Sequence, residues 1–178
     1  MSEPTSPSWY DLLGVAPGST LFVEGAAGAV GSTAVQLAVG LGARVIGSAR
    51  AGHLDFVAGL GAEPVEAGSP LIAASAPVDR ALDAAGAGTL PDLLALTGGD
   101  PDAVVTIADF GAADLGVRLT RGSLAGEPSG THGFARAAAL GPAFRPRVAG
   151  VYPLERLGDA HARLARGGVP GKLVVTLS

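Results

Sequence analysis

A glycine-rich turn between a short apolar run and a helical segment most constrains what this chain can fold into. The run Thr20–Glu24 (TLFVE) has the composition of a strand, and Gly25-Ala-Ala-Gly28-Ala-Val-Gly31 follows it directly, leading into a helix of small residues to about Leu41. Glycines at this spacing suit a chain that leaves a strand in a tight turn, brings bare backbone close to a ligand and starts a helix against the sheet. The pattern therefore predicts a strand–turn–helix unit whose helix start binds an anion.

Strands and helices are predicted to alternate along the rest of the chain, with glycine or proline between them. Further strands are expected at 44–48, 64–66, 78–83, 103–108 and 117–120, and helices around 54–60, 90–96 and 134–140. Such alternation favours a parallel sheet with helices on both of its faces. The predicted fold is α/β, a Rossmann-type doubly wound parallel sheet in a single three-layer domain.

The C-terminal part is predicted to add one helix and two strands. The helix is marked by side chains that recur at helical spacing: Leu154, Leu157, His161 and Leu164. Residues 147–151 are expected to form the last strand of the parallel sheet, and 172–177 form a further apolar strand. We expect residues 1–10 to be a loose leader and 11–178 to be one nucleotide-binding domain with this C-terminal helix and strand.

The bulk composition is that of a globular protein without cysteine. Hydrophobic residues make up 48% and aromatic residues only 4%, so Ala, Val and Leu must fill the core. The absence of cysteine excludes disulfides and a thiolate nucleophile, and no His/Asp/Glu cluster suggests a metal. No apolar stretch reaches membrane-spanning length and no signal peptide is visible, which predicts a cytoplasmic protein. Basic residues are scattered and not interleaved with aromatic ones, which argues against nucleic-acid binding.

Several separated segments carry a resemblance to a known family. They are GAAGAVG, QLAVGLGARVIGSAR, DFVAGLGAE, VDRALDAAG and YPLERLGDAHARLARGGVPGKLVV. Over about residues 12–178 and in the same order, they are similar to the zinc-independent, quinone-oxidoreductase-like branch of the medium-chain dehydrogenase/reductases. The resemblance implies NADPH-dependent reduction of quinones or activated double bonds. It also implies an N-terminal, mostly β catalytic domain, in place of which this chain has only the short leader.

The residues after the predicted second strand indicate which dinucleotide binds. NAD-binding proteins place an Asp or Glu there to hold the ribose 2′-hydroxyl, whereas this chain has Ser48, Ala49 and Arg50. A hydroxyl and a guanidinium can bind a 2′-phosphate, and His53 is near enough in sequence to add a third contact. The alternative is that Arg50 is an ordinary surface arginine after a strand. The missing acid favours NADP(H) over NAD(H).

The expected cofactor site combines the glycine turn with the ends of three strands. Its residues are Gly25, Gly28, Ala29, Val30, Gly31, Ser48, Arg50, His53, Ala85, Gly86, Ile107 and Ala108. The amides of residues 29–31 are expected to point at the phosphates, and by resemblance the loops at 85–86 and 107–108 flank the nicotinamide. No catalytic acid can be named: His132, Tyr10 and Tyr152 are weak candidates, and His161 is expected to be a packing residue.

Two classes of function stay open at this point. The first is an NADP(H)-binding oxidoreductase domain that reduces a quinone, enone or similar activated carbonyl or alkene by hydride transfer. The second is a non-redox protein on the same fold, which senses the cofactor, binds a partner or catalyses a cyclisation-type reaction. Exposed apolar strand edges at 147–151 and 172–177 also predict a homodimer or a separate catalytic subunit. A small molecule is the expected substrate, with neither nucleic acid nor membrane as a partner.

Overall fold

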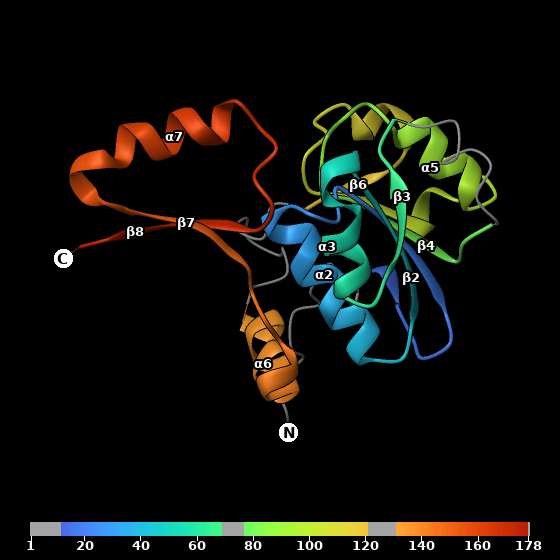
Figure 1. The fold of residues 1–178 in the computed structure, drawn as a ribbon. Helices are drawn as coiled ribbons and strands as arrows, with labels where there is room; N and C mark the ends of the chain where they lie inside the picture. Colours follow the sequence, from blue (N-terminus) through green and yellow to red (C-terminus); the bar gives the residue numbers. More distant parts are fainter. Residues whose placement is uncertain (1–11, 69–76, 121–130, 178) are drawn as a thin grey trace, which may run out of the picture.

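A computed structural model describes residues 12–68, 77–120 and 131–177, so the predicted leader lies outside the described residues. Six strands form one parallel sheet (Figure 1): β1 (Thr20–Glu24), β2 (Arg44–Ala49), β3 (Glu63–Glu66), β4 (Arg80–Asp83), β5 (Val104–Thr106) and β6 (Arg118–Leu119). Their order is β3-β2-β1-β4-β5-β6, so the direction in which the sheet grows reverses between β1 and β4. This is the strand order of the doubly wound dinucleotide-binding fold, and the predicted fold class is confirmed.

Helices cover both faces of the sheet, and alternate strand residues face each layer. On one face, β1 residues Leu21 and Val23 belong to a core shared with α2 (Ala29–Gly40) and α3 (Leu54–Gly59). On the other, Phe22 packs with leucines of α5 (Leu90–Leu96). A β-strand projects successive side chains to opposite faces, so one apolar run supplies both cores.

The short 3₁₀ segments connect these elements. They are η1 (Ala51–His53), η2 (Pro101–Ala103), η3 (Ala112–Leu115), η4 (Gly141–Ala143) and η5 (Leu154–Arg156). Within the described ranges, no helix is long and apolar enough to cross a membrane.

The C-terminal strands do not join the main sheet. β7 (Val148–Pro153) pairs in parallel with β8 (Lys172–Thr176), and α7 (Leu157–Ala165) connects the two. The expectation that residues 147–151 form the last strand of the main sheet is wrong, because β6 holds that edge and the chain then leaves the sheet through α6 (Thr131–Leu140). Figure 1 shows β7, α7 and β8 standing to one side of the sheet, and we call residues 148–177 the C-terminal arm.

The segment leading into the arm is fastened to the helices on one face of the sheet. The backbone amide of Arg145 donates to Oε1 of Gln36 in α2 at 2.7 Å. The guanidinium of Arg147 lies over the ring of Phe56 in α3, 4.7 Å from its centroid, in a cation–π contact. Further on, the amide of Gly171 donates to the carbonyl of Ala27 at 2.8 Å, which brings the arm onto the glycine turn.

Candidate functional site

The three glycines of the turn differ in what an added side chain would meet. Gly25 has a φ of 75°, in the left-handed region that side chains disfavour, and a Cβ there would also lie 3.1 Å from Cβ of Ala85. A Cβ on Gly31 would lie 2.8 Å from the carbonyl carbon of Gly25, so only glycine lets α2 start this close to the strand. A Cβ on Gly28 would meet only the Gly25 carbonyl oxygen, at 3.2 Å, and would otherwise point into open space. The open space beside Gly28 fits a ligand that approaches the backbone.

The start of α2 is uncapped by any side chain. Gly28 is the N-cap residue in an extended conformation, and the first turn of the helix contains no acidic residue. The positive end of the helix dipole is therefore available to an anion. Ala29 is half-buried and Val30 is 42% exposed, so the first turn of the helix borders solvent.

The loops after β4 and β5 meet the glycine turn at the carboxyl edge of the sheet. Oδ1 of Asp83 accepts hydrogen bonds from the amides of Ala85 and Gly86, both at 2.9 Å. A Cβ on Gly86 would lie 2.8 Å from the carbonyl oxygen of Ala108, so these loops touch through backbone. Small residues therefore border the glycine turn at this edge of the sheet. Ile107 lies differently, because it packs partly buried against the core on the α2 and α3 side.

Of the three residues predicted to hold a 2′-phosphate, Ser48 lies apart from Arg50 and His53. Ser48 is fully buried, and its hydroxyl donates to Oε2 of Glu24 at 2.6 Å while accepting from the amide of Gly25 at 3.1 Å. The prediction that Ser48 faces a ligand is therefore corrected, because alternation along β2 turns its side chain into the protein. Arg50 is exposed, and Nε2 of the half-buried His53 lies 3.2 Å from the carbonyl oxygen of Gly168.

Arg50 and His53 thus share a neighbour in the C-terminal arm. A Cβ built on Gly167 would lie 3.1 Å from a guanidinium nitrogen of Arg50, and one on Gly168 would lie 2.7 Å from the other. The glycine pair that follows α7 therefore lies against the guanidinium. An anion bound by Arg50 and His53 at the end of β2 would lie next to this loop.

Sequence reasoning missed a buried row of polar side chains beneath the site. Ser48, Glu24, Asp83 and Thr106 end or nearly end β2, β1, β4 and β5, and each is at most 2% exposed. Burial raises the pKa of Glu24, and the negative charges of Asp83 and Asp92 raise this pKa further. The hydrogen bond from Ser48 lowers it, but the net effect is a raised pKa. The signal was present, since these positions share the strand face of Phe22 by the period of two.

Of the candidate proton donors, only the side chain of Tyr152 lies within the described residues. The hydroxyl of Tyr152 accepts from a guanidinium nitrogen of Arg163 at 3.2 Å, within the arm. His161 is exposed on α7, so the expectation that it packs in a core is wrong. Tyr10 and the side chain of His132 lie outside the described residues. The described part of the chain also holds no cluster of three or more side chains suited to a metal ion.

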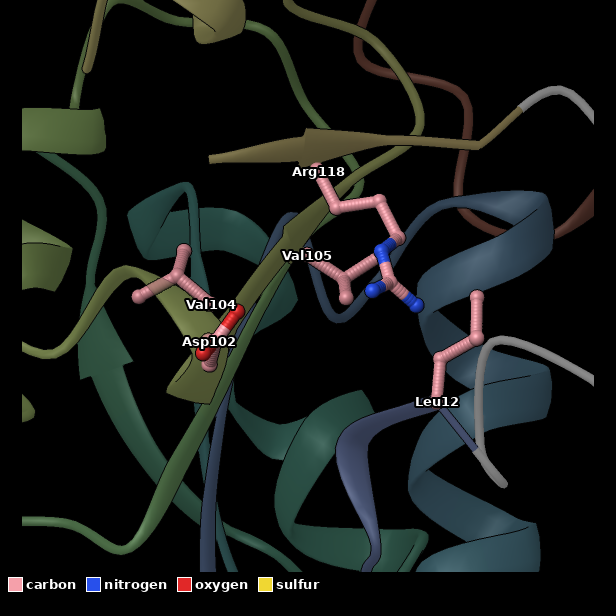
Figure 2. Close-up of a pocket in the computed structure, with 5 residues that line it drawn as sticks. All are labelled: Leu12, Asp102, Val104, Val105 and Arg118. Atoms are coloured by element: carbon pink, nitrogen blue, oxygen red, sulfur yellow. The ribbon is translucent and has the colours of Figure 1, made fainter. Parts of the chain in front are cut away.

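A pocket lies at the opposite edge of the sheet, at the amino ends of the strands. Figure 2 shows it between η2, the amino ends of β5 and β6, and the start of the described chain, with the Arg118 side chain reaching across Val105 towards Leu12. Asp102 and Val104 complete the lining. Ligands of doubly wound sheets bind at the carboxyl ends of the strands. This pocket is therefore not the expected ligand site.

Comparison with known proteins finds likeness in structure. No family model matches the sequence, and no curated protein matches it significantly. A quinone oxidoreductase from Coxiella burnetii superposes with a TM-score of 0.74 at 23% identity, covering 95% of this chain and 56% of that one. A mycobacterial protein in complex with NADPH superposes with a TM-score of 0.69 at 26% identity, covering 91% of this chain and 57% of that one. An NAD-dependent alcohol dehydrogenase superposes with a TM-score of 0.70 at 23% identity, covering 95% of this chain and 54% of that one.

Each of these similarities covers more than nine tenths of this chain. The strand order gives the fold class of this chain, the doubly wound α/β fold of dinucleotide-binding type. The chain shares its fold with these oxidoreductases, in line with the resemblance of its sequence to the medium-chain dehydrogenase/reductases. The chain spans little more than half the length of these three structures.

Proposed function

We propose that the glycine turn binds a nicotinamide dinucleotide, with NADP(H) preferred, and that the chain forms the cofactor half of a reductase. The observation that carries the proposal is the position of the turn. It follows β1, where the strand order reverses towards β4, and ligands of this fold bind at that switch point. The proposed substrate is a quinone, an enone or a similar activated carbonyl or alkene, in line with the quinone-oxidoreductase-like branch.

The residues present fit such a cofactor. The amides at the start of α2 and the open space beside Gly28 would hold the pyrophosphate. The small residues Ala85, Gly86 and Ala108 would leave room for the flat nicotinamide ring at the carboxyl edge. The cofactor supplies the hydride, and the protein's part is to bind and orient it and to keep water away.

Preference for NADP(H) rests on charge at the end of β2. Ala49 ends this strand and Arg50 follows it, so neither position carries a carboxylate that could accept from a ribose hydroxyl or repel a 2′-phosphate. Arg50 and His53 would supply the positive charge and the hydrogen bonds, and Gly167 and Gly168 would close this side of the site.

Assembly is part of the proposal, because the arm has a large exposed apolar surface. A two-stranded sheet is marginal by itself, and here one helix accompanies it. Apolar side chains that are 36% to 82% exposed include Val148, Val151, Leu154, Leu157, Leu164, Val174 and Leu177. A second copy or a separate catalytic subunit would cover this surface and contribute the other wall of the substrate site.

Calorimetry with NADPH and NADH tests the proposal. We expect NADPH to bind at least about tenfold more tightly, which corresponds to about 1.4 kcal/mol. Arg50→Ala should remove most of that preference and leave NADH binding nearly unchanged. Arg44→Ala, at the exposed amino end of the same strand, is the matched control and should keep it. Equal affinities in the wild type would contradict the preference, and tight binding without NADPH oxidation by quinones or enones would favour the non-redox alternative.

A further inference from the structure

The buried polar row consists of two acid–hydroxyl pairs placed side by side. Ser48 donates to Glu24 across β2 and β1, and Thr106 donates to Oδ2 of Asp83 at 2.7 Å across β5 and β4. Glu24 and Asp83 are register partners in neighbouring parallel strands, with their side chains on the same face of the sheet. Two carboxyl groups therefore lie next to each other away from water, directly below the glycine turn.

The two acids are unequally supplied with hydrogen-bond donors. Asp83 accepts from two backbone amides and from the Thr106 hydroxyl. Glu24 accepts from the Ser48 hydroxyl, and the charged groups that act on it, Asp83 on β4 and Asp92 on α5, are both acidic. Adjacent carboxyl groups in a desolvated place cannot both be charged without cost, and this favours the neutral form of Glu24, which has fewer donors.

We propose that Glu24 is a positioning residue that takes up a proton from solvent when the dinucleotide binds, so that cofactor affinity is coupled to pH. This inference rests on the proposed function, because it places the pyrophosphate at the glycine turn. Glu24 directly precedes Gly25, and its carboxyl group is joined to the turn through Ser48, whose hydroxyl holds the Gly25 amide and whose carbonyl accepts from Ala26 at 2.8 Å. The negative charge of the pyrophosphate then acts against a charged carboxylate beneath it.

The direction of the pH effect follows from linkage. Because the pKa of Glu24 is higher in the folded protein than in the unfolded chain, the folded state holds the proton more tightly. The proton on Glu24 contributes fully to stability below the pKa that Glu24 has in the unfolded chain. This contribution is lost as the pH rises through the pKa that Glu24 has in the folded protein. Cofactor binding favours the same protonated form, so affinity should also fall with rising pH, by at most about tenfold per pH unit for one proton.

Calorimetry with NADH in buffers of different ionisation enthalpy measures the protons taken up at each pH above 4.5, the ordinary pKa of a glutamate. NADH is the probe because it lacks a 2′-phosphate, which titrates in this range. We expect uptake of up to about one proton in the wild type, none from this site in Glu24→Gln, and unchanged uptake in Glu63→Gln. Glu63 lies on the same sheet but at the amino end of β3, paired with Arg44. His53→Asn measures the share of the other titratable group at the site.

A second variant tests the hydrogen bond itself. Ser48→Ala removes the donor that favours the charged carboxylate, so the pH range of proton uptake should shift upwards. Wild-type uptake that survives in Glu24→Gln would overturn the proposal. If the Glu24→Gln variant fails to fold, the absence of that upward shift in Ser48→Ala would overturn it instead.

Unfolding measurements separate this inference from the proposed function. If neither dinucleotide binds to the wild type, the proposed function fails, yet the stability of the free protein against pH still reports on Glu24. Glu24→Gln should lose less stability than the wild type as the pH rises, because its amide has no proton to release. Identical pH profiles for the two proteins would show that Glu24 holds no proton in the fold.

Discussion

Gly31→Ala is the substitution for which the structure sets the clearest expectation. The added Cβ would lie 2.8 Å from the carbonyl carbon of Gly25 and 2.9 Å from Cα of Ala26, with the Gly25 carbonyl oxygen nearer still. All three atoms are backbone and cannot rotate away, so the start of α2 must move outwards by at least about half an ångström. Overpacking of this kind costs about 1–3 kcal/mol, a large part of the ~5–15 kcal/mol that stabilises a typical domain.

The assay is urea unfolding at equilibrium, followed by calorimetry with NADPH. Gly59→Ala is the matched control, because Gly59 is also helical and nothing lies within 4 Å of an added Cβ. Removing a flexible glycine there should leave stability unchanged or raise it by up to about 1 kcal/mol. If Gly31→Ala were as stable as Gly59→Ala and bound NADPH like the wild type, the close packing of α2 on the turn would be wrong.

Two further predictions concern the turn and the arm. Gly28→Val should abolish binding of both dinucleotides, because the branched side chain fills the space assigned to the pyrophosphate, while circular dichroism should show a folded protein. Retained binding would mean that the phosphates lie elsewhere. Val151→Glu should break the proposed assembly, measured by light scattering, whereas Leu115→Glu, at an exposed apolar position on η3, should not. A wild-type protein that is monomeric at micromolar concentration would contradict the assembly.

The sequence was sufficient to predict the main sheet and the turn, because both depend on local patterns. The glycine spacing and the alternation of strand and helix are short-range signals, and the structure places β1, β4, β5 and β6 within the predicted segments, while β2 extends one residue beyond its segment. The number of strands in the parallel sheet was overestimated by one at residues 147–151. Strand composition shows that a segment is extended but not which neighbour it pairs with, and here the partner is β8, which follows it in the chain.

The site was predicted only in part, because side-chain direction depends on the strand face. Ser48 stands where a ligand contact is expected by counting along the chain, yet strand alternation turns it inwards to Glu24. Glu24 shares the strand face of Phe22 by the period of two, but a glutamate at a strand end is usually exposed, so that signal alone does not establish its burial. The contact of Arg50 and His53 with Gly168 joins segments far apart in sequence, which no local pattern reveals.

The hydrogen bond from Gly171 to Ala27 makes the motion of the arm separable from the unfolding of the sheet. Gly171 is buried, and its amide is held by a backbone carbonyl of the glycine turn. Swinging the arm away exposes this amide to water while the amides of β1 and β4 stay paired. Hydrogen exchange at Gly171 therefore measures the free energy of that local opening, and exchange in the central strands measures global unfolding. A ligand that binds across the turn and the arm should slow the first exchange rate more than the second.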